Sequence, residues 1–531
     1  MIAYEYGNES KPLLYIGIQG EIELMRKTIQ PETMTIDELK TVLLNIHEKY
    51  YIEMKKATEL PNAFWESYSS FSNTSGGYII LGVSEDIPQN KITGVGNSSK
   101  ALTNLWDQVS NPNKVSFRNI DNHDVNTYVI DGKTVIIVFV KEAMETMKPV
   151  YLNGRLENTW IRTGDGDRKA TKDEIAAFLR NAQPGQDNLG IDGFTMDDLD
   201  TDSIITFKER VSKRYPKMKY IEMSNEQFLS EIGACYIDRV TGKLVIKRGT
   251  LLFLGKVNSI RELFQHFHLD YYNRKGKNPR WIDRISDDEP GEYEINIYNF
   301  YNIVYEKIKA LLQEAFELDN HQIRIPFSDF DETIRECLVN CLAHADYVQG
   351  YPSIKIEVYD GWFRFCNPGK MLVTTQQFLL GGDSRPRNEV IMKFFRLLGA
   401  SERQGFGGPL IYRTALQNDF RRPEIISDIE HTELKVWNID LVDSYPDLSH
   451  EEKKILRFIV KGNQPRSVRE IGKNLQMTEY RVRKGVFALE KHELIVKTGN
   501  GPSTKYAAAL ESVEFLTQLQ LAMENLKKQM V

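Results

Sequence analysis

Three polar residues recur at four-residue intervals inside an otherwise apolar segment, and this stripe limits most strongly what the chain can fold into. Glu336, Asn340 and His344 lie within 335–347, and the positions between them are mostly apolar or small. Residues four apart share one face of a helix. A solvated face would explain the spacing, but the apolar neighbours indicate a largely buried helix. Because buried polar groups need polar partners, we expect the helix over 331–345 to face a polar ligand site in an α/β unit.

The composition places this site in a large protein with several compact units. The chain has 531 residues, of which 41% are hydrophobic and 27% are charged, a balance typical of globular proteins. At roughly 100–200 residues per domain, about three or four units are expected. The formal net charge is −6, which excludes a polycation that coats nucleic acid indiscriminately. Any nucleic-acid site must therefore be local.

The sequence shows no pattern typical of membrane insertion or secretion. No stretch approaches about 18 uncharged apolar residues, and the first residues lack a basic patch followed by an apolar run. The four cysteines are Cys235, Cys337, Cys341 and Cys366. They form no C-x-x-C pair and so indicate neither a zinc site nor a disulfide framework. We therefore expect a cytoplasmic protein with reduced cysteines and no membrane partner.

Acidic residues flank a glycine-containing apolar strand in the N-terminal third. Glu48, Glu53 and Lys55 fit E-x-x-x-x-E-x-K, and 71–83 reads F-S-N-T-S-G-G-Y-I-I-L-G-V. Two further acids follow this strand, Glu85 and Asp86. Carboxylates are the ligands that hard divalent cations prefer, and a bound metal activates water and shields a phosphate. The structural alternative is that Glu53 and Lys55 pair with each other in solvent and the Gly-Gly pair only forms a tight turn.

These strings resemble the Schlafen-type, Alba-like (divergent AAA) nucleic-acid-binding domain of bacterial proteins. The resemblance covers about 38–183 and includes K-P-V-Y at 148–151, W-I-R-T-G at 160–164 and K-D-E-I at 172–175. It implies an α/β domain that binds DNA or RNA, with Arg162 among the contacts. The domain has a ribonuclease branch, in which a carboxylate trio binds a divalent metal.

Carried onto this chain, the ribonuclease resemblance implies a metal site with Lys55 near the scissile phosphate. The catalytic residues would be Glu48, Glu53, Lys55 and Glu85, and the metal ligands would be Glu48, Glu53 and either Glu85 or Asp86. Two positions depart from the family pattern: Met54 replaces a Phe, and Ser84 displaces the acid after the strand. The sequence therefore favours nucleic-acid binding by this domain over cleavage.

The polar stripe itself resembles the N-box of GHKL ATPases. The resemblance implies that Asn340 ligates magnesium or manganese, that Glu336 orients the attacking water as a catalytic residue, and that His344 lies at the nucleotide. Downstream, 363–369 contains an N-P-G in place of the usual adenine loop, and 402–408 reads E-R-Q-G-F-G-G. The implied ATP-binding residues there are Asn367, Gly369, Gly405, Gly407 and Gly408. Glycines let backbone amides approach phosphates; the alternative is a degenerate fold that serves only as a scaffold.

The C-terminal segment has a net positive charge, whereas the chain as a whole has a net negative charge. Residues 451–510 hold 13 Lys and Arg against 6 Asp and Glu, a local excess typical of phosphate contact. Three helices, 451–461, 467–475 and 478–490, precede two short strands around 499–502, an order that resembles a winged helix-turn-helix. The resemblance implies DNA contact through Arg469, Arg481, Arg483, Lys484 and Lys505. A winged helix used for protein contact is the alternative.

Together these units predict an α+β multidomain protein with seven segments. They are an N-terminal extension (1–37), the Schlafen-type Alba-like domain (38–183), a linker (184–205), a connecting α/β region (206–320), a GHKL-like α/β sandwich (321–445), a winged helix (446–508) and a C-terminal helix (509–531). Such a chain resembles nucleotide-regulated nucleic-acid-binding proteins that act in DNA-binding regulation or defence. The alternatives are a metal-dependent endoribonuclease and a homo-oligomeric scaffold that assembles through 512–530.

Overall fold

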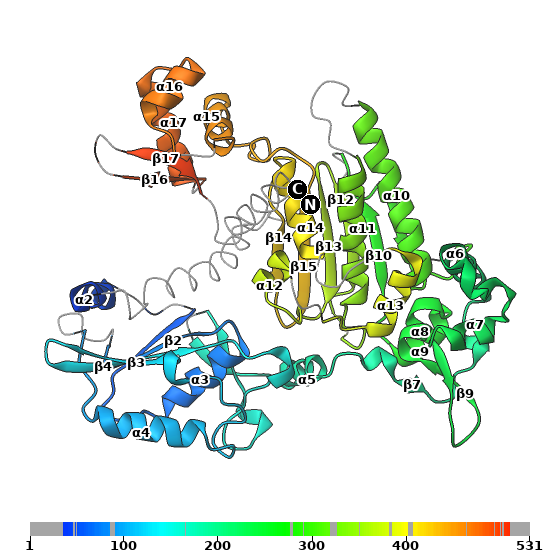
Figure 1. Ribbon diagram of the computed structural model, residues 1–531, viewed down its shortest axis with the longest axis horizontal. Helices are drawn as coiled ribbons and strands as arrows, with labels where there is room; N and C mark the ends of the chain where they lie inside the picture. Colours follow the sequence, from blue (N-terminus) through cyan, green and yellow to red (C-terminus); the bar gives the residue numbers. More distant parts are fainter. Residues whose placement is uncertain are drawn as a thin grey trace, which may run out of the picture.

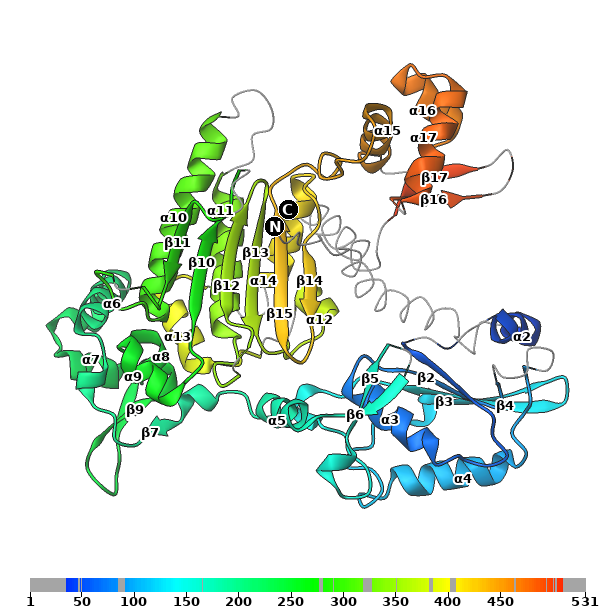
Figure 2. The ribbon, with the colours of Figure 1, turned by 180° about the vertical axis from the view of Figure 1, so that it is seen from behind.

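The computed structural model folds into compact units of mixed helix and sheet (Figures 1 and 2). The structure describes residues 35–45, 48, 50–84, 91–164, 166–276, 280–289, 291–318, 327–349, 351–381, 385–401, 407–462, 465–492, 494–499, 501 and 504–509. The expected α+β multidomain class is confirmed. The predicted N-terminal extension before 35 and the predicted helix after 509 lie outside the described residues. Within the described ranges, no helix has the length and apolar character needed to cross a membrane.

The N-terminal unit is built on a four-stranded sheet in the order β1–β2–β4–β3. Its strands are β1 (Ile52–Lys55), β2 (Gly77–Leu81), β3 (Val125–Ile130) and β4 (Lys133–Val140). β1 runs parallel to β2, and the other neighbours are antiparallel. All five residues of β2 are buried, because α3 (Ala63–Asn73) and α4 (Ser98–Val109) cover one face and α2 (Ile36–Asn45) packs on the other. β2 is therefore the centre of this unit.

The Gly-Gly pair before β2 is required by close packing rather than by a turn alone. Gly76 has a φ of +74°, and a Cβ added at Gly77 would lie 2.5 Å from the ring of Phe71 on α3. Any side chain at Gly77 would push α3 off the sheet. A hairpin of β5 (Trp160–Thr163) and β6 (Gly166–Lys169) also packs on α3, and α5 (Lys172–Asn181) follows it.

Residues 184–205 were expected to form a linker and instead belong to the folded core. They contain η5 (Gln186–Asn188), β7 (Gly190–Ile191), η6 (Met196–Asp198) and the start of α6 (Thr201–Arg214). Ile191, Leu199 and Ile204 are buried in the largest hydrophobic cluster. The acids that suggested a solvated linker are helix caps: Asp198 completes a capping box, and Asp200 caps α6.

The region after α6 packs through aromatic side chains against the unit that follows it. It holds α7 (Asn225–Glu231), β8 (Cys235–Ile237), β9 (Leu244–Lys247), α8 (Arg248–Leu254) and α9 (Val257–Leu263). The ring of Phe207 on α6 contacts Phe253, Tyr298 and Phe394, with centroids 5.6 Å away in each case. One continuous core therefore joins this region to the helices beyond residue 297.

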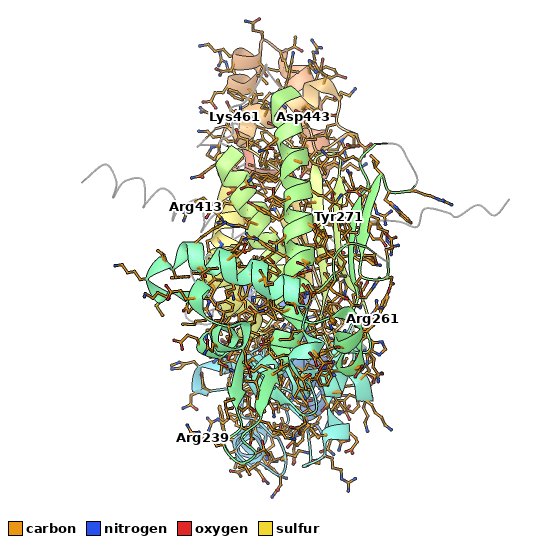
Figure 3. All side chains as sticks on the ribbon, turned by 90° about the vertical axis from the view of Figure 1, so that its right-hand side faces the viewer. Arg239, Arg261, Tyr271, Arg413, Asp443 and Lys461 are labelled. Atoms are coloured by element: carbon orange, nitrogen blue, oxygen red, sulfur yellow. The ribbon has the colours of Figure 1, made fainter. Side chains whose placement is uncertain are left out.

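The central unit is a two-layer arrangement of helices on a six-stranded sheet in the order β11–β10–β12–β13–β15–β14. The strands are β10 (Leu269–Asn273), β11 (Asp283–Ser286), β12 (Ile354–Tyr359), β13 (Trp362–Pro368), β14 (Glu424–Ser427) and β15 (His431–Trp437). The helices on one face are α10 (Ile297–Leu318), α11 (Phe327–Ala343), α12 (Thr375–Leu380), α13 (Glu389–Leu398) and α14 (Gly407–Gln417). Figure 3 views this unit from the side of α10 and labels Tyr271 on β10.

The boundary expected at residue 321 cuts through this sheet. β10 and β11 come from the predicted connecting region, yet β10 pairs in parallel with β12 over five residues. The sequence pattern missed this because β10 is short, reads L-D-Y-Y-N, and carries the acid Asp270 at a buried position. On that outer face Arg364 binds Glu357 and Glu433 from the strands on either side.

The C-terminal unit has its own core, separate from the central one. It consists of α15 (His450–Val460), α16 (Val468–Leu475), α17 (Glu479–Lys491) and a hairpin of β16 (Ile495–Thr498) and β17 (Lys505–Ala508). Ser449 and Ser467 form capping boxes, and Thr478 caps α17. Gly485 lets α17 approach α15, since a Cβ there would lie 2.4 Å from Ile455.

Candidate functional site

A cavity lies between α11, α14 and the helix-covered face of the central sheet. Its floor is formed by sheet residues, and its polar wall by the stripe of α11. The residues that line it include Glu336, Asn340, His344, Phe365, Asn367, Lys370, Arg385, Arg396, Gly407, Gly408, Ile425, Thr432 and Leu434. The cavity thus combines an apolar bed with a few polar groups, as ligand sites commonly do.

The polar stripe is held together by a hydrogen bond along α11. Asn340 Nδ2 donates to Glu336 Oε1 at 3.2 Å. Burial raises the pKa of Glu336, and this hydrogen bond from Asn340 opposes the rise. Because the amide nitrogen of Asn340 is engaged by Glu336, its carbonyl oxygen is left to accept a bond or ligate a cation. The stripe therefore offers a carboxylate and an amide oxygen side by side.

The first residues of α14 close on this stripe at contact distance. A Cβ added at Gly407 would lie 2.2 Å from Glu336 Oε1 and 2.9 Å from Asn340 Nδ2. At Gly408 it would lie 1.8 Å from the backbone oxygen of Phe378. Only glycine fits both positions, and the N-terminus of α14 faces the acid and the amide. Gly405 lies outside the described residues.

Asn367 and Gly369, the first and last residues of the N-P-G string, lie in different surroundings. Asn367 is buried, lines the cavity and donates from Nδ2 to the Pro368 oxygen at 3.1 Å. Gly369 has a φ of +89°, and a Cβ there would lie 2.8 Å from Asp346 and 3.1 Å from Arg387. Gly369, which was expected to bind the cofactor, is not among the residues that line the cavity, and its backbone N–H donates to the backbone oxygen of Glu430 at 2.8 Å.

His344 stands at the end of the stripe, partly buried against Arg387. Burial and then the charge of Arg387 lower the pKa of His344 to about 4. The imidazole is therefore neutral at pH 7, and it enters the site as a polar group without charge.

This depressed pKa predicts an acid-dependent loss of stability. The unfolded chain binds a proton at His344 near pH 6.5, whereas the folded chain binds it only near pH 4. Stability from this group is thus complete above pH 6.5 and falls as the pH drops toward 4, by about 3 kcal/mol at most. We expect His344→Asn to remove this part of the pH dependence in urea titrations at pH 7 and pH 4. If the wild type and His344→Asn lost the same free energy of unfolding between pH 7 and pH 4, the pH dependence would not come from His344.

Lys370 joins the cavity to the N-terminal unit, and sequence reasoning missed it. Its Nζ lies 2.8 Å from Glu142 Oε1 and 3.2 Å from Glu145 Oε1. The same acids bind Lys148, whose side chain is fully buried, at 2.7 and 2.6 Å. Burial alone would raise the pKa of Glu145, but Lys148 and Lys370 outweigh it and hold the pKa at about 2. The only sequence signal was the position of Lys370, directly after the N-P-G string.

Arg387 forms a second connection between the N-terminal unit and the rear of the cavity. Its guanidinium donates to Asn181 at 2.6 Å, to the Lys370 oxygen at 2.8 Å and to the His344 oxygen at 3.0 Å. Beside it, Arg180 of α5 binds Asp346 at 2.8 Å. The Arg387 side chain thus links the backbone at Lys370 and His344 to Asn181 at the end of the N-terminal unit.

Two of the N-terminal acids expected to ligate a metal, Glu48 and Glu53, are bound by other groups of the chain. Glu53 binds Lys55 at 2.8 Å and Arg162 at 2.7 Å, and Arg162 also binds Asp167 at 2.9 Å. Glu48 accepts a hydrogen bond from the backbone N–H of Met54 at 2.9 Å. Both carboxylates are therefore engaged by the protein itself. The other predicted ligands, Glu85 and Asp86, lie outside the described residues.

Arg162 was expected to contact nucleic acid but is buried inside the N-terminal unit. Its side chain has no exposed area, and its guanidinium also donates to the backbone oxygens of Tyr50 and Ile52. It stacks against the ring of Phe71 at 5.1 Å. The x-I-R string therefore supplies the cation that neutralises Glu53, a partner 109 positions earlier in the chain.

A histidine and two acids elsewhere have the composition of a metal site. His268, Asp287 and Asp288 bring their ligand atoms within 4.8 Å of one another. However, His268 Nε2 lies 2.8 Å from Asp270 and Nδ1 lies 2.8 Å from Asp287. The hydrogen bonds that the imidazole donates to Asp270 and Asp287 raise the pKa of His268 to about 10. A protonated imidazole has no lone pair for a metal, so this cluster is an ion-pair network.

The C-terminal unit exposes all five of its predicted nucleic-acid residues, Arg469, Arg481, Arg483, Lys484 and Lys505. Arg481 pairs with Glu451 on α15, and Arg483 pairs with Glu479 one turn earlier at 3.3 Å. Sequence reasoning missed two exposed aromatics on α17, Tyr480 (77% exposed) and Phe487 (70% exposed). Aromatic rings beside cations suit stacking on bases or contact with a protein.

Three family models match separate parts of the chain. The model described as "Schlafen, AlbA_2" matches 48–171, and the one described as "Putative ATP-dependent DNA helicase recG C-terminal" (HATPase_c_4) matches 352–436. A domain of unknown function, DUF8451, matches 176–270. The comparison with curated proteins gave no match. The expected Schlafen-type unit followed by an ATPase-like unit is thus confirmed.

Two solved structures are similar to parts of the chain. The DIP2311 protein from Corynebacterium diphtheriae is 14% identical with a TM-score of 0.37, over 89% of this chain and 99% of that one. The N-terminal domain of a RecG-related helicase protein from Nitrosomonas europaea is 26% identical with a TM-score of 0.19. That match covers 26% of this chain and 90% of the other.

Proposed function

We propose that this chain, which joins a Schlafen AlbA_2 domain to a RecG-type ATPase-like domain, is a nucleic-acid-binding protein regulated by a nucleotide. The observation that carries the proposal is the contact of Gly407 with Glu336 and Asn340 inside the cavity. At Gly407 the bare backbone at the start of α14 lies beside the carboxylate of Glu336 and the amide of Asn340. Backbone N–H groups at a helix N-terminus suit phosphates, and side-chain oxygens suit the cation that accompanies them. The proposed ligand is ATP with magnesium or manganese.

The residues of the cavity fit this ligand in chemical type. The side-chain carbonyl oxygen of Asn340 would hold the cation. The backbone N–H groups at Gly407 and Gly408 would donate hydrogen bonds to phosphate oxygens. The cation would shield the phosphate charge. Glu336, with its raised pKa, is suited to accept a proton from a water molecule that it orients. The sheet residues beneath offer an apolar bed for the base, with Asn367 as a neutral polar partner.

Regulation follows from the double role of Lys370. It lines the cavity and also holds Glu142 and Glu145 of the AlbA_2 domain. A bound nucleotide places negative charge near this ammonium and competes with the two acids for it. Nucleotide occupancy would thereby change how firmly the AlbA_2 domain is held against the ATPase-like domain.

The proposed nucleic-acid contacts lie at the two ends of the chain. The AlbA_2 domain supplies one, and the basic C-terminal unit, which we interpret as a winged helix, supplies the other. The excess of cations on the C-terminal unit supports contact with DNA phosphates. We therefore place the protein among DNA-binding regulators or defence proteins.

The experiment measures the affinity for a labelled DNA duplex and a labelled tRNA by fluorescence anisotropy, with and without a non-hydrolysable ATP analogue and magnesium. We expect the analogue to change the affinity of the wild type by at least about fivefold, the lower end of typical couplings. Lys370→Met should reduce that change to less than about twofold, because the link to Glu142 and Glu145 is lost. Lys355→Met, on the outer face of β12, is the matched control and should behave as the wild type.

Three outcomes would count against the proposal. If the protein bound the nucleotide but its affinity for nucleic acid stayed the same, the ATPase-like domain would not regulate nucleic-acid binding. Absence of nucleotide binding together with a stable oligomer would favour the scaffold alternative. Manganese-dependent cleavage of the tRNA by the wild type would favour the nuclease alternative, and the active site would then include the acids beyond residue 84.

A further inference from the structure

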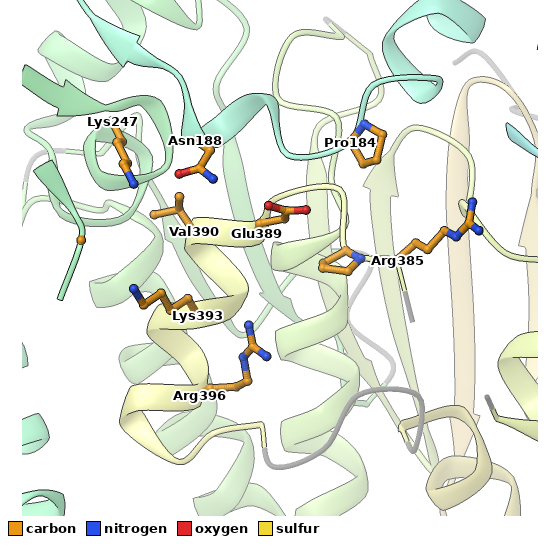
Figure 4. A pocket seen from close by; sticks show the side chains of 10 residues that line it. Pro184, Asn188, Lys247, Arg385, Glu389, Val390, Lys393 and Arg396 are labelled. Carbon is orange, nitrogen blue, oxygen red and sulfur yellow. The ribbon is translucent and has the colours of Figure 1, made fainter. Parts of the chain in front are cut away.

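A second cavity, of about 570 Å³, opens at the junction of the DUF8451 region and α13 (Figure 4). One wall comes from Pro184 and Asn188, another from Gly233 and Lys247. The third wall is α13 and the residues just before it. The volume falls in the range of small-molecule sites.

The cavity concentrates positive charge. Four of its ten lining residues are cations, Lys247, Arg385, Lys393 and Arg396, and its single acid is Glu389. Among the described residues, none of these four cations has an ion-pair partner within 4.0 Å. Elsewhere in the central unit, Arg274 and Arg364 are each paired with Glu357 of β12. Burial, followed by repulsion from Lys247 and Arg396, lowers the pKa of Lys393.

The backbone around Lys393 is shaped to bring its ammonium into the cavity. Gly233 has a φ of +69°, and a Cβ there would lie 3.2 Å from Lys393 Nζ. A side chain at this position would be both strained and in the way of the lysine. Within the described part of the chain, the cavity therefore gathers four cations around the single acid Glu389, so its lining keeps an excess of positive charge.

The walls also offer surface for an uncharged part of a ligand. Pro184, Pro386 and Val390 supply apolar contacts, and Asn188 supplies an amide donor and acceptor. Figure 4 shows Lys247 on one element and Lys393 and Arg396 along α13. Arg385 and Arg396 line the ATP cavity as well, so the two cavities adjoin.

We propose that this second cavity binds a small molecule carrying several phosphate groups, at a site separate from the one proposed for ATP. Several phosphates match a cluster of four cations, and charge-assisted bonds to phosphate are the strong ones. The concave walls, drawn from three separate chain segments, favour a small ligand over a nucleic-acid duplex. A ligand here would bridge the DUF8451 region and the ATPase-like domain.

The test is isothermal titration of the full-length protein with inorganic tripolyphosphate in the absence of divalent metal. We expect the wild type to bind one equivalent, and the double variant Lys247→Gln, Lys393→Gln to bind at least about tenfold more weakly, since two of four charge-assisted contacts are lost. Asn340→Ala should bind tripolyphosphate as the wild type does, because Asn340 lies only in the ATP cavity. The Asn340→Ala measurement therefore distinguishes a failure of the second cavity to bind phosphates from a failure of the proposed ATP site.

The fold of the double variant is checked by thermal unfolding without ligand. Removing repelling charges should leave the melting temperature unchanged or raise it, so weaker binding cannot be a result of unfolding. Unchanged affinity in the double variant would overturn the proposal. The proposal would also be overturned if the wild type bound single-stranded RNA but no tripolyphosphate, and the double variant lost the RNA binding. The cavity would then bind a nucleic-acid strand.

Discussion

Substitution of Asn340 by alanine should abolish magnesium-dependent nucleotide binding while the protein stays folded. The change removes the side-chain amide oxygen of Asn340 beside Glu336, so the cation loses its proposed ligand. We expect the affinity for a magnesium nucleotide to fall by at least about 100-fold, since even indirect partners of a metal are worth 10–100-fold. Isothermal titration with an ATP analogue, with and without magnesium, measures it.

Two companion variants make the Asn340 result specific. Asn340→Asp keeps an oxygen at the same position and should restore binding to within about tenfold of the wild type. Asn418→Ala lies just past α14, where Asn418 only donates to the Thr414 oxygen at 2.8 Å, and should bind normally. If Asn340→Ala binds the magnesium nucleotide as tightly as the wild type, the cation is held elsewhere.

Replacement of Lys148 by methionine should lower the free energy of unfolding by about 3–5 kcal/mol at pH 7. The side chain of Lys148 is fully buried and neutralises Glu142 and Glu145, which are themselves largely buried. Methionine matches its volume but leaves two carboxylates to share the single ammonium of Lys370. Urea unfolding followed by circular dichroism measures the change.

The pH dependence distinguishes this loss of charge from a loss of packing. The depressed pKa of Glu145 contributes stability that is present above pH 4.5 and is lost as the pH falls toward about 2. The deficit of the variant should therefore shrink below pH 4.5. Lys100→Met is the control, because Lys100 and its partner Glu59 are both exposed, and ion pairs at the surface contribute less than about 1 kcal/mol. A constant deficit from pH 7 to pH 3 would indicate a packing effect.

The fold could be predicted from the sequence where local patterns decide it. The apolar periodicity of α11 and the capping residues of α15, α16 and α17 lie within a few positions of the elements that they set. The stripe of Glu336, Asn340 and His344 predicted a cavity because spacing along one helix is a local property. The structure places these three residues in that cavity with Gly407.

What the sequence could not provide are partners that are far apart in the chain. Lys370 and Glu142 are 228 positions apart, and Arg162 and Glu53 are 109 apart. An arginine in an x-I-R string has the same local pattern whether it faces solvent or a buried carboxylate. Gly369 shows the same limit, because its packing against Asp346 and Arg387 depends on how distant segments meet.

The parallel pairing of β10 with β12 determines which part of this protein can exist alone. A fragment that begins at residue 321 would lack β10 and β11, and the edge of β12 would carry unpaired backbone groups that recruit other chains. Such a fragment should aggregate, whereas one that begins near 184 keeps both the sheet and the common core. The ATPase-like domain therefore depends on the preceding segment to complete its sheet, while the C-terminal unit, with a core of its own, can be removed without opening that sheet.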